Sequence, residues 1–154
     1  MKPVQYVKLS TIAAALLVCV SATTFASDGF KIDEKLLQTF RQTFPDAQQV
    51  RWQEESDMYT VNFTENGILT KIRYDKDGNF LSSLRYYSEK NLPVNILCRL
   101  EKKYPGKKVF GVTEMTTDSQ VEYYIKLEDE KTWITIHSNA DGAMQVVEKY
   151  NKAS

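Results

Sequence analysis

The feature that most constrains the fold of this sequence is an internal repeat. Its matching positions pair Phe44-Pro45 with Tyr104-Pro105, Tyr59-x-Val61-x-Phe63 with Tyr123-x-Ile125-x-Leu127, and Asp77-Gly78 with Asp141-Gly142. The offset between matches is 60 residues early in each copy and 64 later. Because a duplicated segment forms the same structural unit twice, we predict two copies of one unit, at about residues 30–88 and about 91–151.

Each copy begins with the pattern of an amphipathic helix. Apolar residues recur on one helical face, at Leu36, Leu37, Phe40 and Phe44 and again at Ile96, Leu97, Leu100 and Tyr104. Asp33 is a suitable N-cap for the first helix, and Asn91 followed by Pro93 is a suitable start for the second. Pro45 and Pro105 end the helices, because the residue before a proline is pushed out of helical geometry.

Four short strands are predicted after each helix, because apolar and polar residues alternate between turn residues. They span residues 50–54, 58–64, 68–75 and 80–87, then 109–114, 121–128, 132–138 and 143–149. Asn66-Gly67 is a strong signal for a two-residue hairpin. Glu130-Lys131 replaces it in the second copy, so that hairpin must use a different turn. Units this small bury too little surface to be stable alone, and we expect both to share one sheet.

Residues 1–26 have the build of a secretory signal peptide. Lys2 and Lys8 flank the start of the segment, an apolar run follows at residues 12–20, and small residues lead to Ala26. The run is too short for a membrane-spanning helix, which needs about 20 residues. We predict that residues 1–26 are removed, and that residues 27–154 form one domain in the periplasm or outside the cell, without membrane insertion.

Charge and cysteine content narrow the class of partner. The 20 Lys and Arg residues balance 20 Asp and Glu residues, without a long basic run, which argues against a nucleic-acid surface. Only Cys98 follows the predicted signal peptide, so no internal disulfide is expected. Because Cys98 stands between Leu97 and Leu100, we expect it to be a small buried hydrophobe.

Several short motifs together resemble a known family. They are Leu92-Pro93 at a helix start, Tyr104-Pro105-Gly106 at its end, the Tyr-x-Val-x-Phe strand, and Tyr74-Asp75-x-Asp77-Gly78. This set resembles the PepSY-like, β-lactamase-inhibitor-like (BLIP-like) periplasmic proteins of Bacteroides-type bacteria. The resemblance implies an α+β fold of two tandem α-β4 repeats, with about eight antiparallel strands and both helices on one face. It also implies that the opposite face is open for protein binding.

The sequence provides little for catalysis or metal binding. His137 is the one histidine, and no nucleophile elbow, HExxH motif, phosphate loop or dinucleotide fingerprint is present. We therefore predict that the protein is not an enzyme and needs no cofactor. Asp75 and Asp77 before Gly78 are a weak calcium candidate, because a calcium loop alternates acidic residues but closes with a glutamate, which is missing here. A hairpin turn explains the same residues.

Strand alternation predicts which residues form the open face. If Tyr59, Val61, Phe63, Ile72 and Tyr74 face the helices, the opposite face carries Thr60, Asn62, Lys71 and Arg73 in the first copy and Tyr124, Lys126, Trp133, Thr135 and His137 in the second. Aromatic residues and arginine dominate interface energetics. The candidate partner-binding residues are Lys71, Arg73, Tyr124, Lys126, Trp133 and His137. A solvated face is the alternative, with Trp133 covered by the segment after Tyr150.

Three functions follow from these features. The first is an exported, non-enzymatic protein whose open face binds a protein or peptide of the cell envelope, including inhibition of an envelope or secreted hydrolase. The second is a calcium- or ligand-responsive periplasmic sensor that uses the turn at residues 75–79. The third is a structural component of the envelope.

Overall fold

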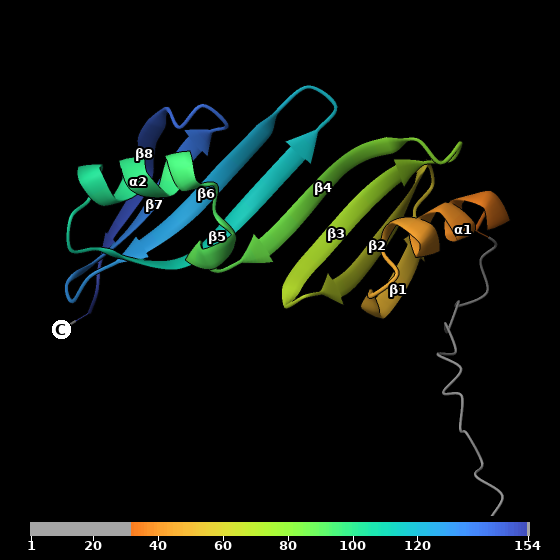
Figure 1. The fold of residues 1–154 in the computed structure, drawn as a ribbon, viewed down its shortest axis with the longest axis horizontal. Helices are drawn as coiled ribbons and strands as arrows, with labels where there is room; N and C mark the ends of the chain where they lie inside the picture. Colours follow the sequence, from red (N-terminus) through yellow and green to blue (C-terminus); the bar gives the residue numbers. More distant parts are fainter. Residues whose placement is uncertain (1–31, 154) are drawn as a thin grey trace, which may run out of the picture.

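The computed structural model describes residues 32–153, and the predicted signal peptide lies outside them. Helix α1 (Glu34–Thr43) is followed by four strands, a short 3₁₀ turn η1 (Glu89–Asn91), helix α2 (Val94–Lys103) and four more strands (Figure 1). The strands are β1 (Gln48–Glu54), β2 (Met58–Glu65), β3 (Ile68–Asp75), β4 (Phe80–Tyr87), β5 (Lys108–Thr117), β6 (Val121–Glu128), β7 (Thr132–Asn139) and β8 (Met144–Asn151).

The eight strands form one antiparallel sheet in sequence order, β1 to β8. Every strand therefore pairs with its neighbours along the chain, and only the β4–β5 connection carries a helix. The predicted α+β class and the shared sheet are confirmed. No helix within residues 32–153 is long and apolar enough to cross a membrane.

The two helices begin differently. The Asp33 side chain caps α1 by accepting hydrogen bonds from the backbone N–H groups of Lys35 and Leu36 at 2.8 and 3.1 Å. The predicted role of Asn91 is wrong, because the N-cap of α2 is Pro93 and Asn91 ends η1. Leu92 is held in extended geometry before the proline, so the helix cannot begin earlier.

The hairpin turns follow the sequence signals. Asn66 and Gly67 both have positive φ, at 51° and 77°, as a two-residue turn of the type I′ class requires. The Glu130-Lys131 hairpin uses a different turn, as predicted. Asp129 Oδ1 accepts hydrogen bonds from the backbone N–H groups of Lys131 and Thr132 at 2.9 and 2.6 Å. The carboxylate thus replaces the positive-φ residues that shape the first-copy turn.

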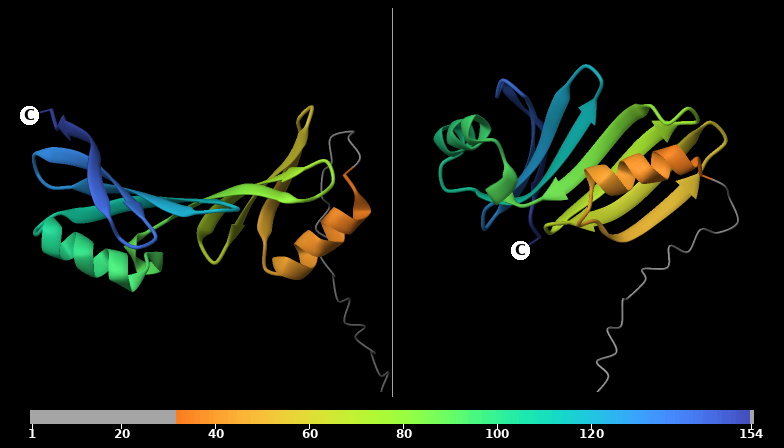
Figure 2. Two further views of the ribbon diagram at one scale, coloured as in Figure 1. Left: turned by 90° about the horizontal axis from the view of Figure 1, so that it is seen from above. Right: turned by 45° about the vertical axis from the view of Figure 1, so that its right-hand side comes forward.

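Both helices lie on the same side of the sheet (Figure 2, left). Each covers its own hydrophobic cluster. Of the residues predicted to face the helices, Val61, Phe63 and Ile72 are buried in the cluster under α1 and Tyr74 packs against it. The cluster under α1 contains Phe40, Val61, Phe63 and Ile72. The cluster under α2 contains Tyr87, Leu92, Ile96, Leu100, Val112, Tyr123, Ile125, Leu127, Ile134 and Ile136. The opposite side of the sheet carries no helix of the described chain, and we call it the open face.

The prediction that Cys98 is buried is wrong, because its side chain is exposed. Ile96 and Leu100 are the buried residues of α2. A residue two positions after Ile96 is rotated about 200° around the helix axis, so Cys98 points away from the sheet. Apolar sequence neighbours on a helix therefore did not indicate burial at this position.

A polar seam on the helix side separates the two hydrophobic clusters. Glu114 on β5 accepts hydrogen bonds from Arg85 Nη1 at 3.0 Å and from the Tyr87 hydroxyl, and its own side chain is only 12% exposed. Burial and the bond to Glu114 raise the pKa of Tyr87 well above its usual range. A cavity of about 630 Å³ lies beside the seam, between it and α1. The seam adds polar contacts between β4 and β5 to the apolar packing of Tyr87 and Ile68 against the cluster under α2.

Candidate functional site

One cross-strand row of side chains runs across the open face from β3 to β7. Leu69 pairs with Tyr86, Tyr86 with Thr113, Thr113 with Tyr124, and Tyr124 with His137. We call these five residues the cross-strand row. Directly opposed residues in an antiparallel sheet point to the same face with Cβ atoms about 5 Å apart. The row is therefore a continuous strip rather than a scatter of surface residues.

The row exposes large apolar side chains. Leu69 is 50% exposed, Tyr86 40% and Tyr124 37%. The adjacent row, two residues along the same strands, places the half-buried side chains of Leu84 and Met115 beside them. Sequence reasoning identified Tyr124 and His137 but missed Leu69 and Tyr86. Strand alternation applied to β3 and β4 could have found both, because each lies two residues from a position on the same face.

Trp133 lies near the row but is partly covered. Phe110 packs edge-on against it with ring centroids 4.9 Å apart. The ammonium groups of Lys126 and Lys152 lie 4.9 and 4.4 Å from the indole centroid, within the range of a cation–π contact. The C-terminal segment therefore contributes to its cover, as the alternative interpretation proposed. Trp133 is half-buried and is a poorer contact residue than Tyr124.

The six predicted partner-binding residues form two groups on the same face. Tyr124 and Lys126 on β6 pair with His137 and Thr135 on β7, and Trp133 follows on the same strand. Lys71 and Arg73 lie on β3, three strands from β6. At the usual strand spacing that separation is about 14 Å. Only a partner that spans the sheet can contact both groups.

His137 ends the row beside a small hollow. Its ring lies 5.0 Å from the Tyr124 ring, its Nδ1 is 3.2 Å from the Gln145 side-chain nitrogen, and its Nε2 is 3.5 Å from Glu122 Oε1. A cavity of about 240 Å³ is lined by His137, Asn139, Ala143, Met144 and Gln145. The Tyr124 ring and the Gln145 side chain position the histidine, whereas its Nε2 is buried without a hydrogen-bond partner.

Thr60 departs from the predicted polar, accessible face. Its register with Gln53 and Arg73 places it on the open face, but its exposed fraction is 0%. The Thr60 hydroxyl lies 3.3 Å from Glu55 Oε1. Neighbouring longer side chains cover this short one, so Thr60 contributes to the packing between β1 and β3 rather than to a contact surface.

The turn after β3 uses the predicted calcium residues as a hairpin. Asp75 accepts hydrogen bonds from the backbone N–H groups of Asp77 and Asn79 at 3.0 and 2.8 Å and from the Asn79 amide at 2.8 Å. The Asn79 bonds hold the pKa of Asp75 below its usual value. No group of three or more potential His, Cys, Asp or Glu metal ligands occurs within residues 32–153.

Solved structures share this architecture. A BLIP-like protein from Bacteroides fragilis aligns over 79% of this chain and 87% of its own, with a TM-score of 0.57 and 15% sequence identity. This chain has the BLIP-like fold. A DUF2874 family protein from Bacteroides ovatus aligns over 80% of this chain and 89% of its own, with a TM-score of 0.56 and 19% identity. The predicted resemblance is confirmed at the level of the fold.

A third similar structure comes from Bacteroides eggerthii, and its name assigns it provisionally to the periplasm. It aligns over 79% of this chain and 90% of its own, with a TM-score of 0.55 and 15% identity. No protein-family model and no curated protein matches this chain. At these identities the likeness establishes the fold, and the function must be argued from the chain's own residues.

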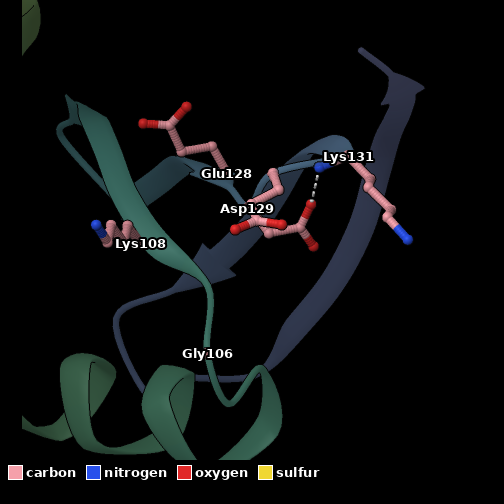
Figure 3. A pocket seen from close by; sticks show the side chains of 6 residues that line it. Gly106, Lys108, Glu128, Asp129 and Lys131 are labelled. Atoms are coloured by element: carbon pink, nitrogen blue, oxygen red, sulfur yellow. Dashed lines mark hydrogen bonds between the residues drawn. The ribbon is translucent and has the colours of Figure 1, made fainter. Parts of the chain in front are cut away.

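The β6–β7 turn of this BLIP-like fold holds a polar cavity of about 590 Å³. Figure 3 shows that Lys108, Glu128 and Lys131 point in different directions at its rim. A catalytic site needs groups that converge on one reacting atom. The arrangement instead supports the turn, because Lys107 Nζ donates hydrogen bonds to Asp129 and, at 3.0 Å, to Thr132 Oγ1.

Replacement of Asp129 by asparagine is expected to lower stability at neutral pH and to matter less in acid. The Lys107 ammonium and the N–H groups of Lys131 and Thr132 hold the pKa of Asp129 well below its usual range. A carboxylate with a depressed folded-state pKa stabilises the fold above its unfolded value of about 4, and that contribution is lost as pH falls. Urea unfolding of both proteins at pH 7 and pH 3 tests this. An equal difference at the two pH values would contradict it.

Proposed function

We propose that this chain is an exported, non-enzymatic binding protein that holds a protein or peptide partner on its open face. The cross-strand row carries the proposal. Three of its five members are apolar or aromatic side chains at least 37% exposed, and they are aligned by strand pairing across β3 to β6. Contiguous exposed apolar surface rimmed by polar residues is typical of interaction sites.

The composition of the face supports protein recognition over a purely solvated sheet. Tyrosine and tryptophan bury large areas at low entropic cost and concentrate interface energy. Tyr86 lies between Leu69 and Thr113 in the row and is 40% exposed, so its ring is available to a partner. A partner that packs against the row would bury Leu69, Tyr86 and Tyr124 together.

The location and the class of partner are proposed from the sequence and from the similar structures. The periplasmic name of the B. eggerthii structure and the signal-like residues 1–26 support export to the envelope. The BLIP-like name of the B. fragilis protein makes an envelope or secreted hydrolase the partner class to test first. The charged side chains at the β6–β7 turn point in different directions (Figure 3), and we propose a binding function rather than a catalytic one.

We also propose that the two halves descend from one duplicated α-β4 unit. Each half has a helix followed by four strands, and its Asp-Gly turn packs under its helix. Gly78 lies against Leu36 of α1, and a Cβ on Gly142 would lie 2.7 Å from Arg99 Cδ of α2. The core and turn positions that the two halves share support duplication. The residues of the open face differ between the halves, which supports a specialised role for that face.

The proposal is tested by partner capture with matched variants. Tyr86→Ala and Tyr124→Ala should leave the melting temperature almost unchanged, because both rings are substantially exposed. Each should weaken binding of the captured envelope partner at least tenfold, the scale of a strong interface residue. Val94→Ala on α2, where Val94 is 74% exposed, is the control for a general loss of surface apolar area.

Equal capture by all three variants and the unmodified chain would remove the open face as the binding surface. Capture of no envelope protein would favour the structural-component alternative. Trp133→Ala is a less clean probe, because its loss also releases Phe110, Lys126 and Lys152 from the indole ring.

A further inference from the structure

We infer that the partner on the open face presents acidic side chains to Lys71 and Lys126, on opposite flanks of the cross-strand row. This inference rests on the proposed function and specifies the chemistry of the partner. On the open face, acidic side chains have contacts within the fold, whereas Lys71 and Lys126 have no ion-pair partner among the described residues.

Four acidic side chains on the open-face side of the described strands have intramolecular contacts. Glu122 lies 3.5 Å from His137, Glu128 forms an ion pair with Lys152 at 2.7 Å, and Glu148 lies 3.3 Å from the Thr135 hydroxyl. Asp75 is held by its turn. Each of these four carboxylates therefore already has a contact within the fold, and that of Glu128 is with a cation.

Basic side chains on the same face lack that compensation. Lys71, Arg73 and Lys126 form no ion pair within residues 32–153, although Lys126 contacts aromatic rings. Arg73 Nε is buried without a hydrogen-bond acceptor. Lys71 and Lys126 are therefore cations beside the exposed apolar row that no carboxylate of the described residues pairs with.

Strand register places the two lysines on opposite sides of the row. Lys71 pairs with Leu84, which neighbours Met115, in the row towards one end of the strands. Lys126 pairs with Thr135 in the row towards the other end. Its ammonium is 4.9 Å from the Trp133 centroid and 5.9 Å from that of Phe110. These aromatic contacts hold Lys126 at the surface without neutralising it.

An acidic protein segment with apolar side chains fits this pattern best. Its apolar groups would pack against Leu69, Tyr86 and Tyr124 while carboxylates on either side meet the lysines. Complementary charge of this kind accelerates association and selects partners. A nucleic acid or an anionic membrane would instead need clustered cations along its phosphates, whereas here cations are separated by the apolar row.

The test uses the exported chain and two synthetic probes of equal length, a random copolymer of glutamate and tyrosine and one of lysine and tyrosine. The acidic copolymer is expected to bind, and the basic one to bind at least tenfold more weakly. Lys71→Glu and Lys126→Glu should each weaken binding of the acidic copolymer about threefold to tenfold at low salt, with a smaller effect at high salt. Lys35→Glu on α1 is the control for the same change in net charge.

The possible results distinguish failure of this inference from failure of the proposed function. If Tyr86→Ala and Tyr124→Ala weaken both copolymers equally while the lysine variants behave like the control, the face binds protein without acidic preference and the inference fails. If neither tyrosine variant affects binding, the proposed function fails as well. Absence of binding to the acidic copolymer, or equal lysine dependence with duplex DNA or phosphatidylglycerol vesicles, would also overturn the inference.

Discussion

Replacement of Phe40 by alanine is expected to lower the free energy of unfolding by about 3–5 kcal/mol, the usual cost of removing a buried phenylalanine. Phe40 is 4% exposed. Its ring centroid lies 5.1 to 5.3 Å from those of Phe44, Trp52 and Phe63. One substitution would thus disrupt the contact between α1 and the sheet at its centre.

The effect should be severe against a total stability of roughly 5–15 kcal/mol for a domain. Gln38→Ala provides the control, because Gln38 is exposed on the same helix and alanine is a better helix former. Thermal and urea unfolding followed by circular dichroism measure both variants. A melting curve for Phe40→Ala that matches the unmodified chain would show that α1 is not packed as described.

The second large effect is expected at Glu114. Glu114→Ala should cost about 2–3 kcal/mol, because it leaves the buried Tyr87 hydroxyl and the Arg85 guanidinium without their acceptor. That figure is below the usual cost of breaking a fully buried ion pair, because the Arg85 side chain is 39% exposed. Urea unfolding at neutral pH is the measurement.

Glu114→Gln is the matched variant, since its amide oxygen still accepts a hydrogen bond. It should cost less than Glu114→Ala. Tyr87→Phe should also cost less, because it removes only one donor and leaves the Arg85–Glu114 pair intact. Equal stability of Glu114→Ala and the unmodified chain would mean that the polar seam does not hold β4 and β5 together.

Local sequence signals predicted the strands and turns well, for physical reasons that are visible in the structure. The predicted strands at residues 68–75, 80–87 and 121–128 have the observed bounds. Alternating burial and tight turns at Asn66-Gly67 and Asp77-Gly78 leave little freedom in where a strand begins or ends. Asp33 was also identified correctly, because N-cap chemistry depends on a few neighbouring residues.

The candidate site could be predicted only in part, because it depends on pairing between distant strands. Tyr86 neighbours Thr113 through the β4–β5 ladder, and those strands are connected through η1 and α2 rather than through a hairpin. No turn therefore fixes their register in the sequence. The contact of Phe110 with Trp133 could not be predicted from the sequence either, since Phe110 lies where the β5–β6 register shifts.

A partner that packs against the cross-strand row would lie within reach of Tyr86 and Tyr124. A photo-crosslinking amino acid placed in turn at Tyr86, Tyr124, Phe44 and Val94 tests this in the presence of the captured envelope partner. Phe44 lines the cavity on the helix side, and Val94 begins α2. We predict crosslinks from Tyr86 and Tyr124 and none from the other two. Crosslinks from Phe44 or Val94, with none from the tyrosines, would contradict the account.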